Sequence, residues 1–133
     1  MVGAAAHEKR RILVVDDDGD STHMIKILLE KTGCYLVVEE NDATKAHRDA
    51  RIFRPDLILL DMMMPQRDGG DVALEIEADP GLQRTPILFL TALVTKAEAR
   101  AGLQIQGHPV LAKPINIPEL IEKIEENLPA KAA

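Results

Sequence analysis

The stretch Leu57-Ile58-Leu59-Leu60-Asp61-Met62-Met63-Met64-Pro65 places four bulky aliphatic residues directly before an acid, with a proline four positions further on. A short continuous apolar run bounded by turn formers is typical of a strand that is buried on both faces. Asp61 should then lie where this strand leaves the core. In an open α/β sheet that place is the carboxyl edge, where binding sites usually form. Because Asp is also common in turns, the other strand ends decide whether Asp61 is structural or functional.

The alternation of a short apolar run with a helical pattern continues along the chain. Strands are expected at residues 12–15, 35–38, 57–60, 87–90 and 110–112. Helices are expected at residues 21–32, 42–54, 71–78, 95–101 and 116–128, with a loop at 103–109. This order predicts a three-layer α/β fold, the flavodoxin-like (βα)5 arrangement with a parallel five-stranded sheet of order 2-1-3-4-5. Pro109 directly precedes the last strand, which fits an edge strand because proline cannot donate to a central ladder.

The chain has 133 residues, a formal net charge of −6 and a single cysteine, Cys34. This length predicts one domain, at residues 10–128, with flexible tails at 1–9 and 129–133. The acidic balance argues against direct binding to nucleic acid or to an anionic membrane. A lone cysteine forms no internal disulfide and no apolar run is long enough to span a bilayer, so we expect a cytoplasmic protein. Cys34 itself is expected to be buried at the start of a strand.

Polar side chains stand at the ends of four of the expected strands. Asp16 and Asp17 follow the first strand, Asp61 the third, Thr91 the fourth and Lys113 the fifth. Because the carboxyl ends of parallel strands share one edge, these side chains are expected to converge. Two carboxylates about 4 Å apart repel by about 4 kcal/mol at an effective dielectric constant of about 20, so such a cluster binds protons or a cation.

Hard oxygen ligands with room for water suit Mg²⁺ or Mn²⁺. A bound divalent ion would attract the oxygens of a phosphoryl group, to which Thr91 offers a hydroxyl and Lys113 an ammonium. Asp61 would then be free to act as a nucleophile and to form an acyl phosphate. The strand ends therefore predict a metal-dependent phosphoryl-transfer site.

Five short motifs together resemble the receiver domains of two-component response regulators, including single-domain receivers of the chemotaxis type. They lie at residues 14–17, 60–65, 68–69, 90–92 and 113–114, and the similarity covers about residues 10–128. The resemblance implies a phosphoacceptor signalling domain, not an enzyme, that accepts phosphate from a histidine kinase and assists its own phosphotransfer and dephosphorylation. Its output would be an altered protein-binding face built from the fourth helix, fifth strand and fifth helix, with phosphorylation able to drive dimerisation.

The resemblance also implies the metal ligands. Asp61 would be the phosphoacceptor, Asp17 would ligate Mg²⁺ directly, and Asp16 would do so largely through water. The main-chain carbonyl of Met63 would supply a further ligand. The implied metal set is therefore Asp16, Asp17, Asp61 and Met63.

Other residues would carry the response to phosphorylation. By the resemblance, Thr91 would move toward the phosphoryl group and Lys113 would contact it. The family usually has a cis peptide bond before the proline that is Pro114 here. It often has Tyr or Phe three residues before the Lys, as a rotameric reporter, but this chain has Val110. Without that aromatic ring, any signal should travel by loop movement.

Two further departures concern the loops. Residues 103–109, with Gly107-His108-Pro109, differ from the usual Gly-Ala pattern of the family. Met63 and Leu93 occupy the positions that tune hydrolysis of the acyl phosphate in the family. Neither apolar side chain can orient an attacking water, so we expect slow autodephosphorylation.

Two other functions compete with this interpretation. Residues 16–19 fit the Asp-x-Asp-Gly signature of haloacid dehalogenase-type phosphatases, with Asp16 as nucleophile and Asp18 as general acid. That family needs a further acidic pair after the Lys, whereas this chain has no Asp after Asp79, and Asp61 would be left unexplained. The second alternative is a receiver-shaped scaffold that binds partners without phosphorylation, an option that Val110 keeps open.

Overall fold

The computed structural model describes residues 8–130, so most of the two expected tails lie outside the described residues. The elements, in chain order, are β1 (Arg10–Val15), α2 (Gly19–Lys31), β2 (Tyr35–Glu40), η1 (Ala43–Lys45), α3 (Ala46–Phe53), β3 (Leu57–Asp61), α4 (Gly69–Ala78), β4 (Ile87–Thr91), α5 (Lys96–Arg100), β5 (Gln104–Ile105), β6 (His108–Ala112) and α6 (Ile117–Asn127).

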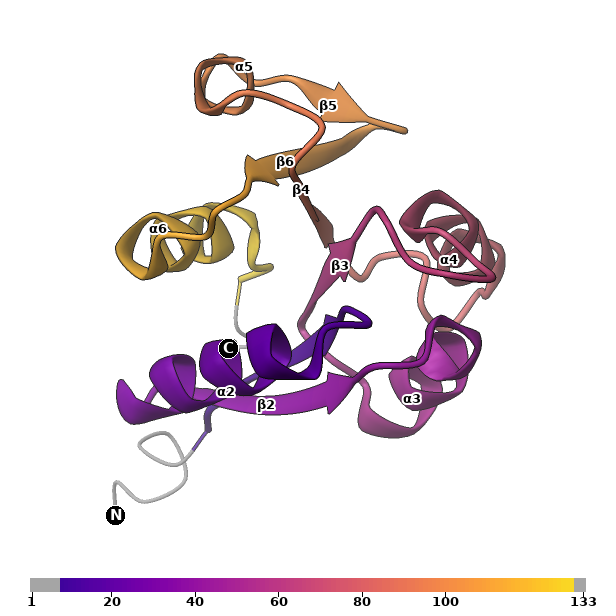
Figure 1. The fold of residues 1–133 in the computed structure, drawn as a ribbon. Coiled ribbons are helices and arrows are strands. Elements are labelled where there is room, and N and C mark those ends of the chain that lie inside the picture. The colour runs from indigo at the N-terminus through magenta and orange to yellow at the C-terminus, as the bar shows by residue number, and fades with distance from the viewer. Residues whose placement is uncertain (1–7, 131–133) are drawn as a thin grey trace.

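The strands form one sheet of order β2-β1-β3-β4-β6-β5. The first five of these pair in parallel, which confirms the predicted flavodoxin-like order, with β6 as the fifth parallel strand. In Figure 1, α2 and α6 lie on one side of the sheet and α3 and α4 on the other. The short helix α5 lies beside β5 and β6 at the far end of the sheet.

The prediction of a loop at residues 103–109 is wrong, because this segment forms most of a β-hairpin. β5 pairs antiparallel with β6, Gln104 opposite Pro109 and Ile105 opposite His108, so the sheet has six strands and not five. The last parallel strand, expected to be an edge strand that follows Pro109, therefore lies between β4 and β5, and Pro109 is its second residue. The two turn residues, Gln106 and Gly107, have φ values of 54° and 81°. Positive φ at both positions is the backbone that a two-residue hairpin requires. A two-residue strand is too short to carry an alternating pattern, which is why the sequence did not reveal it.

Alternate residues of the central strands feed two separate cores. Ile58 and Leu60 of β3 pack with α3 and α4, whereas Leu57 and Leu59 pack with α2 and α6. All four side chains are buried, as expected for a strand covered on both faces. Burial of each such Leu or Ile is worth about 1.5–3 kcal/mol, so the strand that carries Asp61 is firmly anchored.

The helices that start at the carboxyl edge of the sheet are capped by the loops that precede them. Asp18 caps α2 and Asn116 caps α6, each through its side chain. Asp68 forms a reciprocal capping box with Asp71 at the start of α4. These caps satisfy backbone N–H groups that have no partner within the helix, and so they fix the loops beside the strand ends.

Two smaller expectations are also corrected. Cys34 is exposed; it lies in the turn before β2, and its sulfur contacts the main-chain oxygen of Thr32. The helix expected at 42–54 is divided into η1 and α3. Within residues 8–130, no helix is both long and apolar enough to cross a membrane.

Candidate functional site

Three carboxylates meet at the carboxyl edge of the sheet. Asp61 is the last residue of β3 and Asp16 directly follows β1, and the pairing of Val15 with Leu60 sets these ends side by side. Asp16 and Asp61 are only 2% and 3% exposed, whereas Asp17 is exposed. One ligand oxygen from each of the three lies within 4.8 Å of the others.

Lys113 enters the same cluster from the end of β6. Its Nζ lies 2.7 Å from Asp61 Oδ1 and 3.1 Å from Asp16 Oδ2, so one ammonium bridges both buried carboxylates. Its main-chain N–H donates to the carbonyl of Thr91 at 2.8 Å, which ties the ends of β4 and β6 together. The peptide bond between Lys113 and Pro114 is cis.

The surroundings raise the pKa values of both Asp61 and Lys113. Burial raises the pKa of Asp61 above its ordinary value; the hydrogen bond from Lys113 opposes this, while the charges of Asp16 and Asp17 add to it. Burial alone would lower the pKa of Lys113, but the hydrogen bonds and charges of Asp61 and Asp16 outweigh it and raise that pKa. The ammonium therefore stays protonated at neutral pH and offsets part of the carboxylate repulsion.

Thr91 ends β4 at the same edge and is fully buried. It lies one residue beyond Leu90, the partner of Asp61 in the sheet. Its Oγ1 accepts a hydrogen bond of 3.0 Å from the main-chain N–H of Leu93, which fixes the start of the following loop. Val110 is also buried and pairs with Phe89, so it lies within the core.

The loop from β3 to α4 closes one side of the site. Gly69 N–H donates to the carbonyl of Met62 at 3.0 Å. A Cβ at position 69 would overlap the main-chain oxygen of Asp61 and lie 3.0 Å from Met62 Cα, so this close approach requires glycine. The sequence contained Gly69 only as part of a motif, and nothing in its pattern revealed this packing role. The Met63 and Leu93 side chains are exposed, at 63% and 64%.

The donor set fits a small hard cation. Carboxylate oxygens from three residues, one of them open to solvent, are the ligands that Mg²⁺ takes while keeping several waters. In the observed arrangement Lys113 supplies only one positive charge to three acids. A divalent ion would complete the charge balance of this cluster.

The phosphatase alternative meets an obstacle at Asp18. This side chain accepts from the main-chain N–H groups of Asp20 and Ser21 and from the Ser21 hydroxyl. The hydrogen bonds from Ser21 lower the pKa of Asp18. An acid held ionised as a helix cap is unsuited to donate a proton to a leaving group.

Comparison with known proteins identifies the class. The family model for the response regulator receiver domain matches residues 12–125, and the chain therefore belongs to this family. It is 37% identical over 120 residues to the DNA-binding response regulator MtrA of Mycolicibacterium paratuberculosis, covering 90% of this chain and 52% of that protein. The chain thus spans about half the length of the curated relatives it matches.

Solved structures agree with this assignment. The chemotaxis protein CheY4 of Vibrio cholerae superposes with a TM-score of 0.79 at 26% identity, covering 91% of this chain and 100% of that one. The receiver domain of a sensor histidine kinase from Pseudomonas aeruginosa, solved with a magnesium ion coordinated in its active site cleft, gives 0.75 at 30% identity, with coverage of 90% and 98%. Receiver domains are phosphoacceptor signalling domains that bind Mg²⁺ in an acidic pocket.

Proposed function

We propose that Asp61 accepts a phosphoryl group from a histidine kinase in a Mg²⁺-dependent reaction. The observation that carries this proposal is the meeting of Asp16, Asp17, Asp61 and Lys113 at one sheet edge. We take residues 10–128 as the receiver unit and the cytoplasm as its compartment. The single cysteine of the chain supports a reducing environment.

The transfer follows from the positions of these groups. An Asp61 carboxylate oxygen attacks the phosphorus of a phosphohistidine, and the new O–P bond forms as the P–N bond breaks. The electron pair of the P–N bond stays on the nitrogen of the departing imidazole. Lys113, already 2.7 Å from Asp61, would follow the incoming phosphoryl oxygens, and the Thr91 hydroxyl would donate to another. The product is an acyl phosphate on Asp61.

Asp16, Asp17, Asp61 and the main-chain carbonyl of Met63 are the proposed metal ligands. When bound there, Mg²⁺ or Mn²⁺ would neutralise negative charge on the phosphoryl oxygens. Asp17 is exposed and so stands where a hydrated ion would enter. Asp16, held by Lys113, is better placed to act through water.

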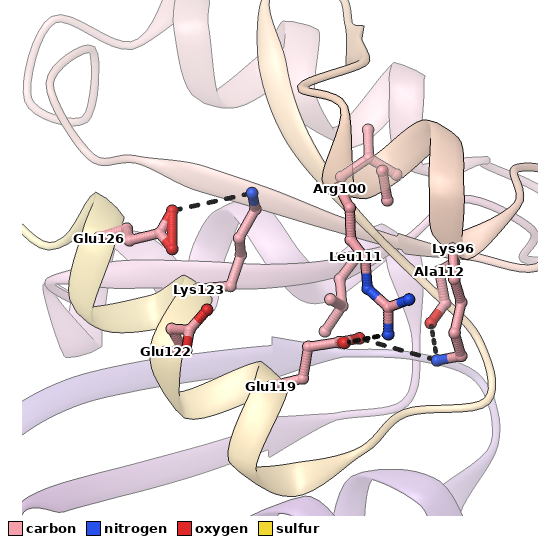
Figure 2. Close-up of a pocket in the computed structure, with 10 residues that line it drawn as sticks. Lys96, Arg100, Leu111, Ala112, Glu119, Glu122, Lys123 and Glu126 are labelled. Atoms are coloured by element: carbon pink, nitrogen blue, oxygen red, sulfur yellow. Dashed lines mark hydrogen bonds and ion pairs between the residues drawn. The ribbon is translucent and has the colours of Figure 1, made fainter.

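We propose that the output face is formed by α5, β6 and α6. Figure 2 shows a groove there, in which Lys96 and Arg100 of α5 face Glu119 of α6. Arg100 lies 2.8 Å and Lys96 lies 3.7 Å from the Glu119 carboxylate. Lys96 Nζ also donates to the main-chain oxygen of Pro114 at 2.9 Å, next to Lys113. A shift of Lys113 on phosphorylation would therefore reach this groove directly, and a second copy of the chain is one candidate partner.

Intact-mass spectrometry after incubation with acetyl phosphate and Mg²⁺ tests the proposal. Wild type should gain one phosphoryl group, and EDTA should prevent the gain. Asp61→Asn should gain none, whereas Asp16→Asn should be phosphorylated more slowly. A gain that persists in Asp61→Asn but disappears in Asp16→Asn would favour the phosphatase mechanism. No gain in any protein would favour the non-phosphorylated scaffold.

A further inference from the structure

Asn41, the residue after β2, holds the segment that carries Asp16 and Asp17. Its Nδ2 donates to the main-chain oxygen of Asp16 at 2.7 Å and to Thr22 Oγ1 at 2.9 Å. A primary amide carries two N–H groups, so one nitrogen can serve both acceptors. Asn41 thereby links three elements at the edge of the site: the end of β1, the first turns of α2 and the end of β2.

Thr22 and Glu39 hold the Asn41 amide in this orientation. Thr22 is fully buried, and its hydroxyl proton is shared between Glu39 Oε1 at 2.9 Å and the main-chain oxygen of Gly19 at 3.1 Å. The hydroxyl oxygen is then available to accept from Asn41. Because Glu39 belongs to β2 and Thr22 to α2, the hydrogen-bonded chain fixes the amide from both sides.

We propose that Asn41 is a positioning residue for the metal site. This inference rests on the proposed function, in which Asp16 and Asp17 are metal ligands. Asp16 is almost fully buried, so its carbonyl has little access to water and depends on a protein donor. With the Asn41 bond in place, the backbone on which both carboxylates stand has one preferred arrangement before the cation arrives.

The remaining hydrogen bonds of the segment restrain other atoms. Asp16 N–H donates to the carbonyl of Glu40 at 3.1 Å, and Asp18 N–H donates to Asp16 Oδ1 at 3.0 Å. Neither bond uses the Asp16 carbonyl, which directly precedes Asp17. Loss of Asn41 would therefore leave the chain folded, but with the peptide between Asp16 and Asp17 free to rotate.

Asn41 suits mutation because the residue as a whole is exposed, so truncation leaves no buried cavity. In Asn41→Ala the affinity for Mg²⁺ alone should fall about tenfold, the lower end of the loss seen when an outer-shell partner of a metal ligand is removed. The affinity is read from the rise of the thermal unfolding midpoint with MgCl₂ concentration. Without metal, the midpoint should fall by several degrees, because the buried Asp16 carbonyl loses its donor, but unfolding should remain a single cooperative transition.

Asn127→Ala is the matched control, since its Nδ2 also donates to a main-chain oxygen, that of Lys123 at 2.8 Å, near the end of α6. Its Mg²⁺ affinity should equal that of wild type. Thr22→Val keeps the buried volume but removes the hydroxyl that orients Asn41. It should weaken Mg²⁺ binding as well, and the double variant should bind no more weakly than Asn41→Ala, because both act through one connection.

Wild-type Mg²⁺ affinity in Asn41→Ala, or fully additive losses in the double variant, would overturn the inference. Asp17→Asn separates this failure from a failure of the proposed function. If Mg²⁺ stabilises wild type but not Asp17→Asn, the metal site stands and only the role of Asn41 is in question. If Mg²⁺ stabilises wild type and Asp17→Asn alike, the metal ligands are misassigned and both proposals fall.

Discussion

A carboxylate buried beside two others opposes folding unless it is compensated. Asp61 stands at the end of a fully buried strand, with Asp16 and Asp17 beside it and Lys113 as its cation. The raised pKa of Asp61 means that the folded state binds this proton more tightly than the unfolded chain does. Ionised Asp61 therefore lowers the stability of the metal-free protein at neutral pH.

Asp61→Asn should accordingly stabilise the metal-free protein at pH 7 by on the order of 1 kcal/mol, the usual size of a single-residue effect. The difference should shrink as the pH falls toward the ordinary Asp pKa of 3.8, because wild-type Asp61 then becomes protonated in both states. Urea unfolding at several pH values measures this. Asp20→Asn, on the exposed first turn of α2, should give little change; a destabilised Asp61→Asn at pH 7 would contradict the argument.

The phosphorylated form should be long-lived. Met63 and Leu93 are exposed on the two loops beside the site, and neither apolar side chain offers a strong hydrogen-bonding group to orient water. After removal of the phosphodonor, we expect the phosphoryl group to persist for minutes or longer, as followed by intact mass. A half-life of seconds in the purified protein would refute this, and Met63→Asn should shorten the lifetime if a polar group at this position helps water attack.

At the residue scale, the sequence predicted which side chains meet at the sheet edge, but it did not predict the residues that hold them in place. Asp16, Asp61 and Lys113 could be found because strand ends share an edge and their side chains differ sharply from the apolar runs before them. Asn41 could not be found in this way. Its role depends on a hydrogen bond across 25 positions of sequence, and an Asn after a strand is also an ordinary turn residue.

Among the elements, α4 begins in close contact with the main chain of Asp61. Gly69→Ala should improve the intrinsic helix propensity by up to about 1 kcal/mol. The new Cβ would nevertheless meet the Asp61 main chain, so we expect a net loss of about 1–3 kcal/mol, as for overpacking. Denaturant unfolding checks this, with Gly19→Ala as control because its Cβ would lie 3.7 Å from the nearest atom. Equal effects of the two substitutions would contradict the packing argument.

The β5–β6 hairpin offers a test of backbone strain. Gln106 has a φ of 54°, which an Asn adopts more readily than a Gln. Gln106→Asn creates the Asn-Gly pair favoured in such turns and should stabilise the protein by about 0.5 kcal/mol. Gln104→Asn, in the neighbouring strand β5, should give no gain in the same unfolding experiment. A loss of stability in Gln106→Asn would show that the Gln side chain, which lies near Gly70, matters more than the turn.

The prediction of helices and strands failed at the β5–β6 hairpin, where the local pattern of apolar residues is weakest. The long apolar runs of β1, β3 and β4 are unmistakable, because each is buried on both faces. The hairpin is held by tertiary contacts instead. His108 Nε2 lies 2.7 Å from Glu77 of α4, and its ring packs edge-on against Phe89. Such contacts leave no periodic trace in residues 103–109.

For the whole molecule, the parallel sheet is what turns separate motifs into a site. Four segments that are distant in sequence contribute Asp16, Asp61, Thr91 and Lys113 to one edge because β1, β3, β4 and β6 are neighbours. The alternation of strands and helices was enough to predict this order. The additional strand β5 pairs with the outer side of β6. It leaves the carboxyl ends of the parallel strands, where the four side chains meet, unchanged.

Metal binding should be visible as global stability. Since a cation would bind the folded cluster and not the unfolded chain, wild type should gain about 2.7 kcal/mol at a Mg²⁺ concentration a hundred times the dissociation constant. Asp17→Asn should lose most of this gain, and Ca²⁺ should be less effective in a site with few ligands. Thermal unfolding with and without EDTA measures both effects. Equal stabilisation of wild type and Asp17→Asn would place the ion elsewhere.

The identity of the phosphorylated side chain tests the central claim most directly. Borohydride reduces an aspartyl phosphate to homoserine, so reduction of the phosphorylated protein followed by peptide mapping reports which aspartate carried the phosphoryl group. We predict homoserine at position 61 and unmodified Asp16 and Asp17, with no conversion when EDTA is present. Homoserine at position 16 or 17, with Asp61 intact, would contradict the account.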